Sequence, residues 1–259
     1  MSESVKNKVL LLSGTSEGPL LAGALTQAGF QVRATVTRPE ARRNLFGSLK
    51  NIKVEVRGFT ETTLADFLKA GYADIVLDAT HPFAVRITQI AHGVCARLGV
   101  PYVRYERPDW QPPEGTLFAD SFAQAAAQLP DLGGRILLTI GAKQLKHFSG
   151  LHQQVTLFAR ILPSPISLAQ AEAAGFTPDR LVRERPPFSQ AVNQALFKDL
   201  GVQVLVTKAS GSAGGVAEKV LAARELGMKV LMIRRPTVAG LFAVATFDQA
   251  VQACLACAS

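Results

Sequence analysis

The sequence has few cysteines and no long apolar run. Three cysteines among 259 residues, Cys95, Cys254 and Cys257, are too few for the disulfide framework of a small secreted protein. No stretch reaches the roughly 18 to 20 consecutive apolar residues that a membrane-spanning helix needs. Residues 1–8 are polar and lack the layout of a secretory signal. We therefore expect a cytoplasmic protein with no membrane partner.

Motifs that would fix other reaction classes are also missing. The first glycine turn lacks the full G-x-G-x-x-G spacing, and Lys208 precedes its glycines, so it does not form a Walker loop and ATP hydrolysis is not expected. Cys254 and Cys257 have no second cysteine pair and no nearby histidine, so we expect ordinary thiols and no metal site. No Ser/His/Asp nucleophile order stands out.

Acidic residues are outnumbered, which limits the partners. The chain carries 28 Lys and Arg against 20 Asp and Glu, a net charge of +8, and this favours acidic partners. The arginines are spread singly over loops and strand ends, without a basic tail or one basic helix face. This scatter fits a small substrate with several carboxylates better than nucleic acid, although a solvated basic surface explains part of it equally well.

Apolar strands alternate with helices along the whole chain. We expect strands at 8–12, 31–36, 53–56, 75–78 and 102–105, then at 135–140, 155–161, 180–184, 202–207 and 229–233. Strands that are apolar throughout and separated by helices indicate parallel sheets covered on both faces. Three prolines between residues 107 and 113 mark a linker. The sequence therefore predicts an α/β fold of two domains, residues 1–108 and 114–259, with a ligand cleft between them.

The first strand runs directly into small residues and a helix. Gly14, Thr15, Ser16 and Glu17 follow it, and a helix N-terminus beside a strand's carboxyl end is where anionic cofactors bind. An ordinary β–α turn would also favour these residue types. The turn alone is thus a weak indication of a cofactor site.

The end of the second strand sharpens this interpretation. Units that bind NAD usually place an acid here, whereas this chain has Thr37 and Arg38. An arginine can bind a 2′-phosphate that an acid would repel. We therefore expect NADPH rather than NADH as the cofactor, with Arg38 as a plain surface charge the alternative.

Polar residues follow two further strands. Thr80 and His81 come after the fourth strand, and His81 could donate a proton, hold a ligand or cap the loop. In the second domain, Lys208, Ser210 and Gly211 begin a glycine-rich loop whose backbone could approach a phosphate or a carboxylate. We expect Thr80, Lys208 and Gly211 to contact the cofactor.

Six segments in order resemble the precorrin-6A reductase family of cobalamin biosynthesis. They are 14–17, 78–84, 102–108, 139–141, 159–163 and 207–215, where 14–17 reads Gly-Thr-Ser-Glu and 78–84 reads Asp-Ala-Thr-His-Pro-Phe-Ala. The resemblance implies two Rossmann-like domains, NADPH as hydride donor, and reduction of one double bond of precorrin-6A to give precorrin-6B. Ser13 stands where relatives often carry another glycine.

This implied substrate, a tetrapyrrole-derived ring bordered by acetate and propionate groups, agrees with the basic charge. We expect its carboxylates to bind Arg86, Arg104, Lys143, Arg160 and Ser210. Two alternatives stay open, a reductase of another polycarboxylate and a non-catalytic dinucleotide-sensing module. No motif indicates a contact with a metal chelated by the macrocycle, so the sequence does not tell whether the substrate is metal-free or cobalt-bound precorrin.

Overall fold

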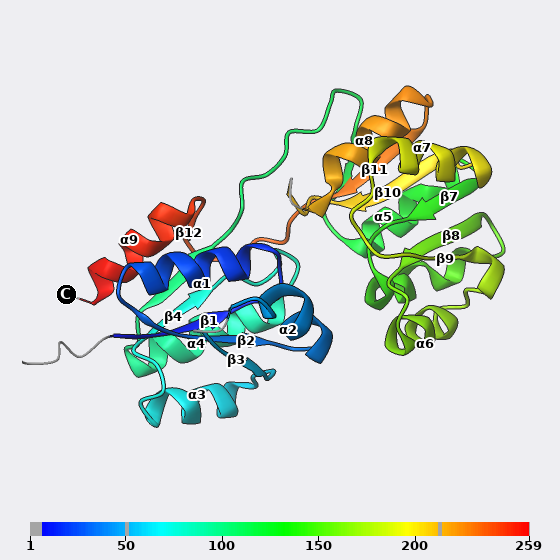
Figure 1. The fold of residues 1–259 in the computed structure, drawn as a ribbon. Coiled ribbons are helices and arrows are strands. Elements are labelled where there is room, and N and C mark those ends of the chain that lie inside the picture. Colours follow the sequence, from blue (N-terminus) through cyan, green and yellow to red (C-terminus); the bar gives the residue numbers. More distant parts are fainter. Residues whose placement is uncertain (1–6, 50–51, 212–213, 259) are drawn as a thin grey trace, which may run out of the picture. The chain divides into compact units, whose positions relative to one another are not determined.

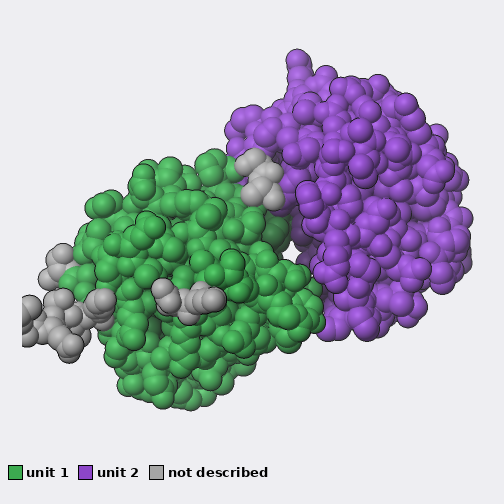
Figure 2. All heavy atoms as spheres, viewed as in Figure 1, with its two compact units in different colours: residues 1–108, 237–259 green, residues 109–236 purple. Residues whose placement is uncertain are grey.

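Parallel strands form two separate sheets in the computed structural model, which describes residues 7–49, 52–211 and 214–258. Each sheet belongs to its own unit: unit 1 comprises residues 1–108 and 237–259, and unit 2 comprises residues 109–236 (Figure 2). The expected α/β class with two parallel sheets is confirmed. The expected second domain, residues 114–259, differs at its end, because residues 237–259 return to unit 1.

Unit 1 has the strand order of dinucleotide-binding proteins. Its six-stranded sheet runs β12-β5-β4-β1-β2-β3, with all pairs parallel. This order reverses between β1 and β4, which is the point where ligands bind in open α/β sheets. The strands are β1 (Lys8–Leu12), β2 (Gln31–Val36), β3 (Lys53–Val56), β4 (Ile75–Asp78), β5 (Tyr102–Tyr105) and β12 (Ala243–Val244). The helices are α1 (Glu17–Gln27), α2 (Pro39–Phe46), α3 (Glu61–Lys69), α4 (Val85–Leu98) and α9 (Phe247–Cys257).

Alternation along the strands of unit 1 explains its three layers. In β1, Val9 and Leu11 face one core, with α1, α2 and α9 (Figure 1), and Leu10 and Leu12 face the other, with α3 and α4. A strand that is buried on both faces reads as an unbroken apolar run, which is why the sequence predicts these strands well.

Unit 2 repeats this plan. Its sheet runs β6-β11-β10-β7-β8-β9, again all parallel, and the order reverses between β7 and β10. The strands are β6 (Leu117–Ala119), β7 (Arg135–Leu138), β8 (Thr156–Ile161), β9 (Leu181–Arg183), β10 (Val204–Lys208) and β11 (Lys229–Ile233). The helices are α5 (Phe122–Gln128), α6 (Pro165–Ala173), α7 (Gln190–Asp199) and α8 (Val216–Glu225), with 3-10 segments η1 (Leu129–Asp131), η2 (Ala142–Leu151) and η3 (Pro178–Arg180).

Each time the chain passes from one unit to the other, it enters an edge strand of the unit that it reaches. The chain leaves β5 of unit 1 and enters β6, the edge strand of unit 2, and it leaves β11 of unit 2 and enters β12, the edge strand of unit 1. The final helix α9 then packs in the core of unit 1, where Ala250 and Cys254 are fully buried. This pairing is the physical reason why the tail belongs to unit 1 and not to unit 2. Over the described ranges, no helix has both the length and the apolar character to cross a membrane.

Candidate functional site

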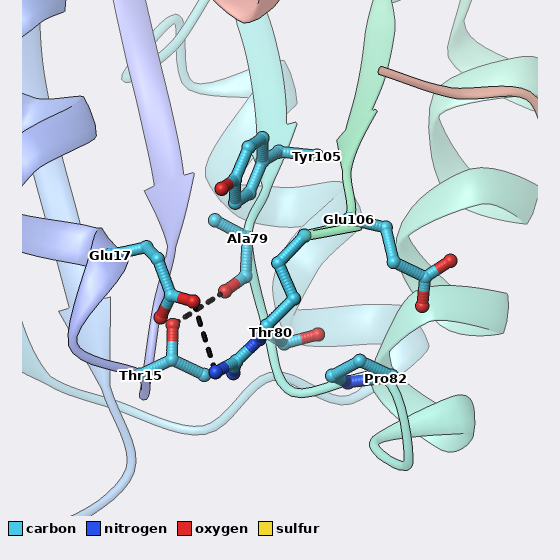
Figure 3. A pocket seen from close by; sticks show the side chains of 8 residues that line it. Thr15, Glu17, Ala79, Thr80, Pro82, Tyr105 and Glu106 are labelled. Carbon is cyan, nitrogen blue, oxygen red and sulfur yellow. Dashed lines mark hydrogen bonds and ion pairs between the residues drawn. The ribbon is translucent and has the colours of Figure 1, made fainter. Parts of the chain in front are cut away.

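A shallow pocket lies at the carboxyl edge of the unit 1 sheet, where the strand order reverses (Figure 3). It is lined by Thr15, Glu17, Ala79, Thr80, Pro82, Tyr105, Glu106 and Arg107. Thr15 Oγ1 donates a hydrogen bond to the carbonyl oxygen of Ala79 at 3.4 Å, which ties the β1–α1 turn to the β4–α4 loop. The structure thus brings together the predicted site residues Thr15, Glu17 and Thr80.

Two glycines of the β1–α1 turn have different reasons to be glycine. A Cβ added at Gly18 would lie 1.9 Å from Ser13 Oγ, so packing within the protein excludes a side chain there. A Cβ added at Gly14 would meet no atom within 4 Å, and Gly14 is not among the glycines with positive φ. Neither packing nor backbone conformation requires glycine at Gly14, so the open space beside it is available to a ligand.

The carboxylate of Glu17 is bound by the chain itself. Glu17 is 7% exposed, and its Oε1 lies 3.0 Å from Arg107 Nη1 in an ion pair. Ser16 Oγ donates to Oε2 at 3.1 Å. Because a bare carboxylate would repel a phosphate, the pairing with Arg107 is what keeps this helix start compatible with an anion. Burial, reinforced by the charge of Glu17, also raises the pKa of Tyr105.

A buried aspartate at the end of β4 shapes the loop beside this pocket. Asp78 is fully buried, and its Oδ1 accepts hydrogen bonds from the backbone N–H and the Oγ1 of Thr80, at 2.9 and 2.7 Å. Its Oδ2 accepts from Thr88 Oγ1 and from Tyr102 Oη, both at 2.8 Å. Arg104 Nη1 lies 2.8 Å from Oδ1.

Sequence reasoning missed the role of Asp78, and it took Arg104 for a substrate ligand. Arg104 is only 3% exposed and also lies 3.6 Å from Glu106. Its guanidinium therefore neutralises Asp78. The structure gives Arg104 this structural role, and its expected contact with a substrate carboxylate stays a prediction.

His81 shapes the same loop. Its Nδ1 accepts a hydrogen bond from the Phe83 backbone N–H at 3.1 Å, and its carbonyl oxygen accepts from the Ala84 N–H at 2.7 Å. A ring nitrogen that accepts a hydrogen bond carries no proton, so a neutral His81 in this arrangement has its proton on Nε2. This geometry is compatible with a His81 that caps the loop or holds a ligand.

The end of β2 presents basic side chains to solvent. Thr37 and Arg38 are exposed, and α2, which the sequence analysis did not predict, begins at Pro39 directly after them. Glu40, in the first turn of α2, lies 3.7 Å from Arg43 in an ion pair. Arg38 is therefore the charged residue immediately beyond β2, beside the β1–α1 turn in the parallel sheet.

The carboxyl edge of unit 2 collects further predicted residues. Lys208 is the last residue of β10, Ser210 is buried, and Gly211 has a φ of 78°, a conformation that favours glycine. Burial lowers the pKa of Lys208 to about 8. The rest of this predicted loop includes residues 212–213, which lie outside the described residues.

The remaining predicted residues have different surroundings. Arg86 on α4 and Lys143 in η2 are exposed, whereas Arg160 in β8 is buried. The predicted cleft between the two domains stays a prediction. Within the described part of the chain, no group of three or more His, Cys, Asp or Glu residues is placed to hold a metal ion.

Comparison with known proteins assigns this arrangement to a family. A model of the family described as "Precorrin-6x reductase CbiJ/CobK" matches residues 8–255. The chain belongs to this family. The precorrin-6x reductase assignment confirms the expected class of protein, an oxidoreductase of cobalamin biosynthesis.

Named relatives agree with the family assignment. The cobalt-precorrin-6A reductase of Synechocystis is 39% identical over 231 residues, covering 88% of each chain. The precorrin-6A reductase of Rhodococcus erythropolis is 38% identical over 237 residues, covering 88% of this chain and 89% of its own. A solved structure of the CobK precorrin-6A reductase superposes with a TM-score of 0.78 at 30% identity and covers 96% of both chains. Two Rossmann-like domains, as expected, are thus confirmed.

Proposed function

We propose that this chain reduces one double bond of the precorrin-6A macrocycle to give precorrin-6B, with NADPH as the electron donor. The names of the relatives support the substrate, since they include both cobalt-precorrin-6A and precorrin-6A reductases. The strand order of unit 1 supports a nicotinamide dinucleotide.

The proposal is supported by the positions of buried side-chain N and O atoms that make no hydrogen bond. Within the described residues these side-chain atoms belong to Ser13, Arg160, Thr207 and Glu218; Oε1 of Glu17 also accepts no hydrogen bond but is paired with Arg107. Each residue lies in the last two positions of a strand, directly after a strand, or in the first turn of the helix that follows one. Native proteins rarely leave such atoms unpaired without reason. Their collection at the carboxyl edges of both sheets supports ligand sites there.

The residues of unit 1 fit NADPH. The open space at Gly14 lets a pyrophosphate approach the start of α1, where Ser16 makes no capping hydrogen bond to the helix. Arg38, which follows the neighbouring strand β2, would bind the 2′-phosphate. NADPH, when bound, supplies the hydride.

The chain itself contributes positioning. Thr15 and Thr80 line the pocket from the two loops that meet at the switch point, and Asp78 fixes the second loop. His81, held by its Nδ1, presents its other ring nitrogen to hold cofactor and substrate together. A proton from solvent or from a substrate group then completes the reduction.

In unit 2, the lysine and glycine loop and the basic residues are assigned to the anionic groups of the ligands. Lys208 and Gly211 would contact cofactor phosphates, and Ser210, Arg160, Lys143 and, in unit 1, Arg86 would contact substrate carboxylates. These roles follow from residue type and from their places at strand ends or exposed helix positions.

The test is whether purified protein oxidises NADPH when precorrin-6A or its cobalt complex is added. Consumption of NADPH with formation of the reduced macrocycle supports the proposal, and comparison of the two substrates identifies the preferred one. NADPH binding without turnover of either substrate would favour a dinucleotide-sensing module instead. Turnover of a different polycarboxylate alone would favour the other alternative.

A further inference from the structure

One buried arginine of unit 2 differs from the other buried arginines of the described chain in making no ion pair. Three arginines of the described chain are buried, and two of them pair with carboxylates: Arg104 with Asp78 and Arg107 with Glu17. Arg160 is 8% exposed, and within the described residues it makes no ion pair. Its Nε and Nη2 atoms are buried and lack any hydrogen-bond partner there.

The guanidinium of Arg160 is nevertheless held in place. Its Nη1 donates to Asn193 Oδ1 at 2.9 Å, and its Cζ lies 4.2 Å from the centre of the Phe188 ring. Asn193 is itself fixed, because its Nδ2 donates to the Ser189 carbonyl oxygen at 2.9 Å. The Nε–Nη2 edge that remains is the edge of a guanidinium that binds a carboxylate or phosphate with two parallel hydrogen bonds.

Two lysines add positive charge near this edge. Lys208 ends β10, and Lys219 lies in the first turns of α8, so both belong to the same carboxyl edge of the sheet as Arg160. Burial, together with the charges of Arg160 and Lys208, lowers the pKa of Lys219 to about 8. Glu218 opposes this effect on Lys219, and Glu184 acts in the same way on Arg160. These groups therefore interact electrostatically, and the three positive side chains outnumber the two carboxylates.

We propose that Arg160 and Lys219 form a binding site for one oxyanion, a carboxylate or a phosphate. The Nε–Nη2 edge of Arg160 takes two oxygens of the anion once neighbouring side chains turn aside, and the ammonium of Lys219 balances its charge. The identity of the anion, a carboxylate of the macrocycle or a phosphate of NADPH, rests on the proposed function. The existence of the anion site is independent of the proposed function.

The first experiment uses simple anions and needs no enzymatic activity. Thermal unfolding of the full chain is followed by the fluorescence of Trp110, which packs against the core of unit 2, in inorganic phosphate, in citrate and in chloride of equal ionic strength. We expect phosphate or citrate to stabilise the natural protein, and Arg160→Gln and Lys219→Gln to abolish that effect. Arg224→Gln, an exposed residue on the same helix as Lys219, should leave it intact.

Anion stabilisation that is absent in the natural protein, or equal in all variants, would overturn the proposal. Lys219→Gln keeps the test decisive if Arg160→Gln does not fold, because Lys219 is only partly buried.

A second pair of measurements distinguishes the sources of the anion. Loss of a charge-assisted pair should weaken the bound group roughly ten- to hundredfold. A higher KM for precorrin-6A in Arg160→Gln, with an unchanged Kd for NADPH, identifies a substrate carboxylate. A higher Kd for NADPH identifies a cofactor phosphate. Unchanged values for both, in an active enzyme, would refute an anion site that serves either ligand.

Discussion

Asp78→Asn should destabilise unit 1 strongly while leaving unit 2 unchanged. The fully buried carboxylate of Asp78 balances the charge of Arg104, which is 3% exposed and lies 2.8 Å away. Removing one partner of a buried ion pair costs about 3–5 kcal/mol of unfolding free energy, because the other charge stays buried. Asparagine keeps one acceptor oxygen, and Glu106 lies 3.6 Å from Arg104, so we expect the lower end, about 3 kcal/mol.

The distribution of aromatic residues makes the assay selective. The three tyrosines, Tyr72, Tyr102 and Tyr105, all lie in unit 1, whereas the one tryptophan, Trp110, lies in unit 2. Urea unfolding followed by the near-ultraviolet circular dichroism of tyrosine and by tryptophan fluorescence therefore reports each unit. With a slope of about 1–3 kcal/mol per molar urea, the tyrosine midpoint should fall by about 1 M or more.

Two controls separate the buried pair from charge effects in general. Glu61→Gln breaks the pair with Arg97, in which both side chains are more than half exposed, and should cost less than about 1 kcal/mol. Adding Arg104→Met to Asp78→Asn should recover part of the loss, since no buried charge then remains. A loss below about 1 kcal/mol in Asp78→Asn, or an equal shift of both transitions, would refute the reasoning.

Four further predictions follow from other parts of the site. Arg38→Ala should weaken NADPH by about 1.5–3 kcal/mol and leave NADH unaffected in titrations; equal losses would contradict a 2′-phosphate contact. Gly14→Ala should leave the unfolding midpoint unchanged, because its Cβ meets no atom, yet reduce NADPH affinity; unchanged affinity would remove Gly14 from the cofactor site. His81→Ala should raise KM or Kd, whereas His81→Asn, whose oxygen can also accept the loop N–H, should restore binding; a missing limb in the pH profile of both variants would indicate a general acid instead. Unit 2 should become more stable as pH rises from about 8 towards 10.5, because Lys219, with its pKa lowered from 10.5 to about 8, binds fewer protons when folded than when unfolded; tryptophan-detected urea midpoints should rise less in Lys219→Met.

Ten strands were predicted from the sequence, five of them in unit 1 with the bounds that the structure has, but the short edge strands β6 and β12 were not predicted. The strands at 8–12, 31–36 and 75–78 match the structure because most of their buried positions carry apolar residues. Strands β6 and β12 have three and two residues, too few to show a period. The return of the tail to unit 1 depends on the pairing of Ala243 and Val244 with β5, a long-range contact with no local signal.

The candidate site shows the same limit at the level of single residues. Arg104 and Arg160 are each the penultimate residue of a parallel strand, and both are buried. From the sequence they are equivalent, and both were predicted to bind substrate. Arg104 has Asp78 on the neighbouring strand β4 as its counter-ion, whereas the guanidinium of Arg160 contacts Asn193 and Phe188 and makes no ion pair within the described residues. A buried arginine with a counter-ion in the fold stabilises the loop, and the one without an ion pair is the one that we propose binds an anion, so only the packed structure separates the two arginines.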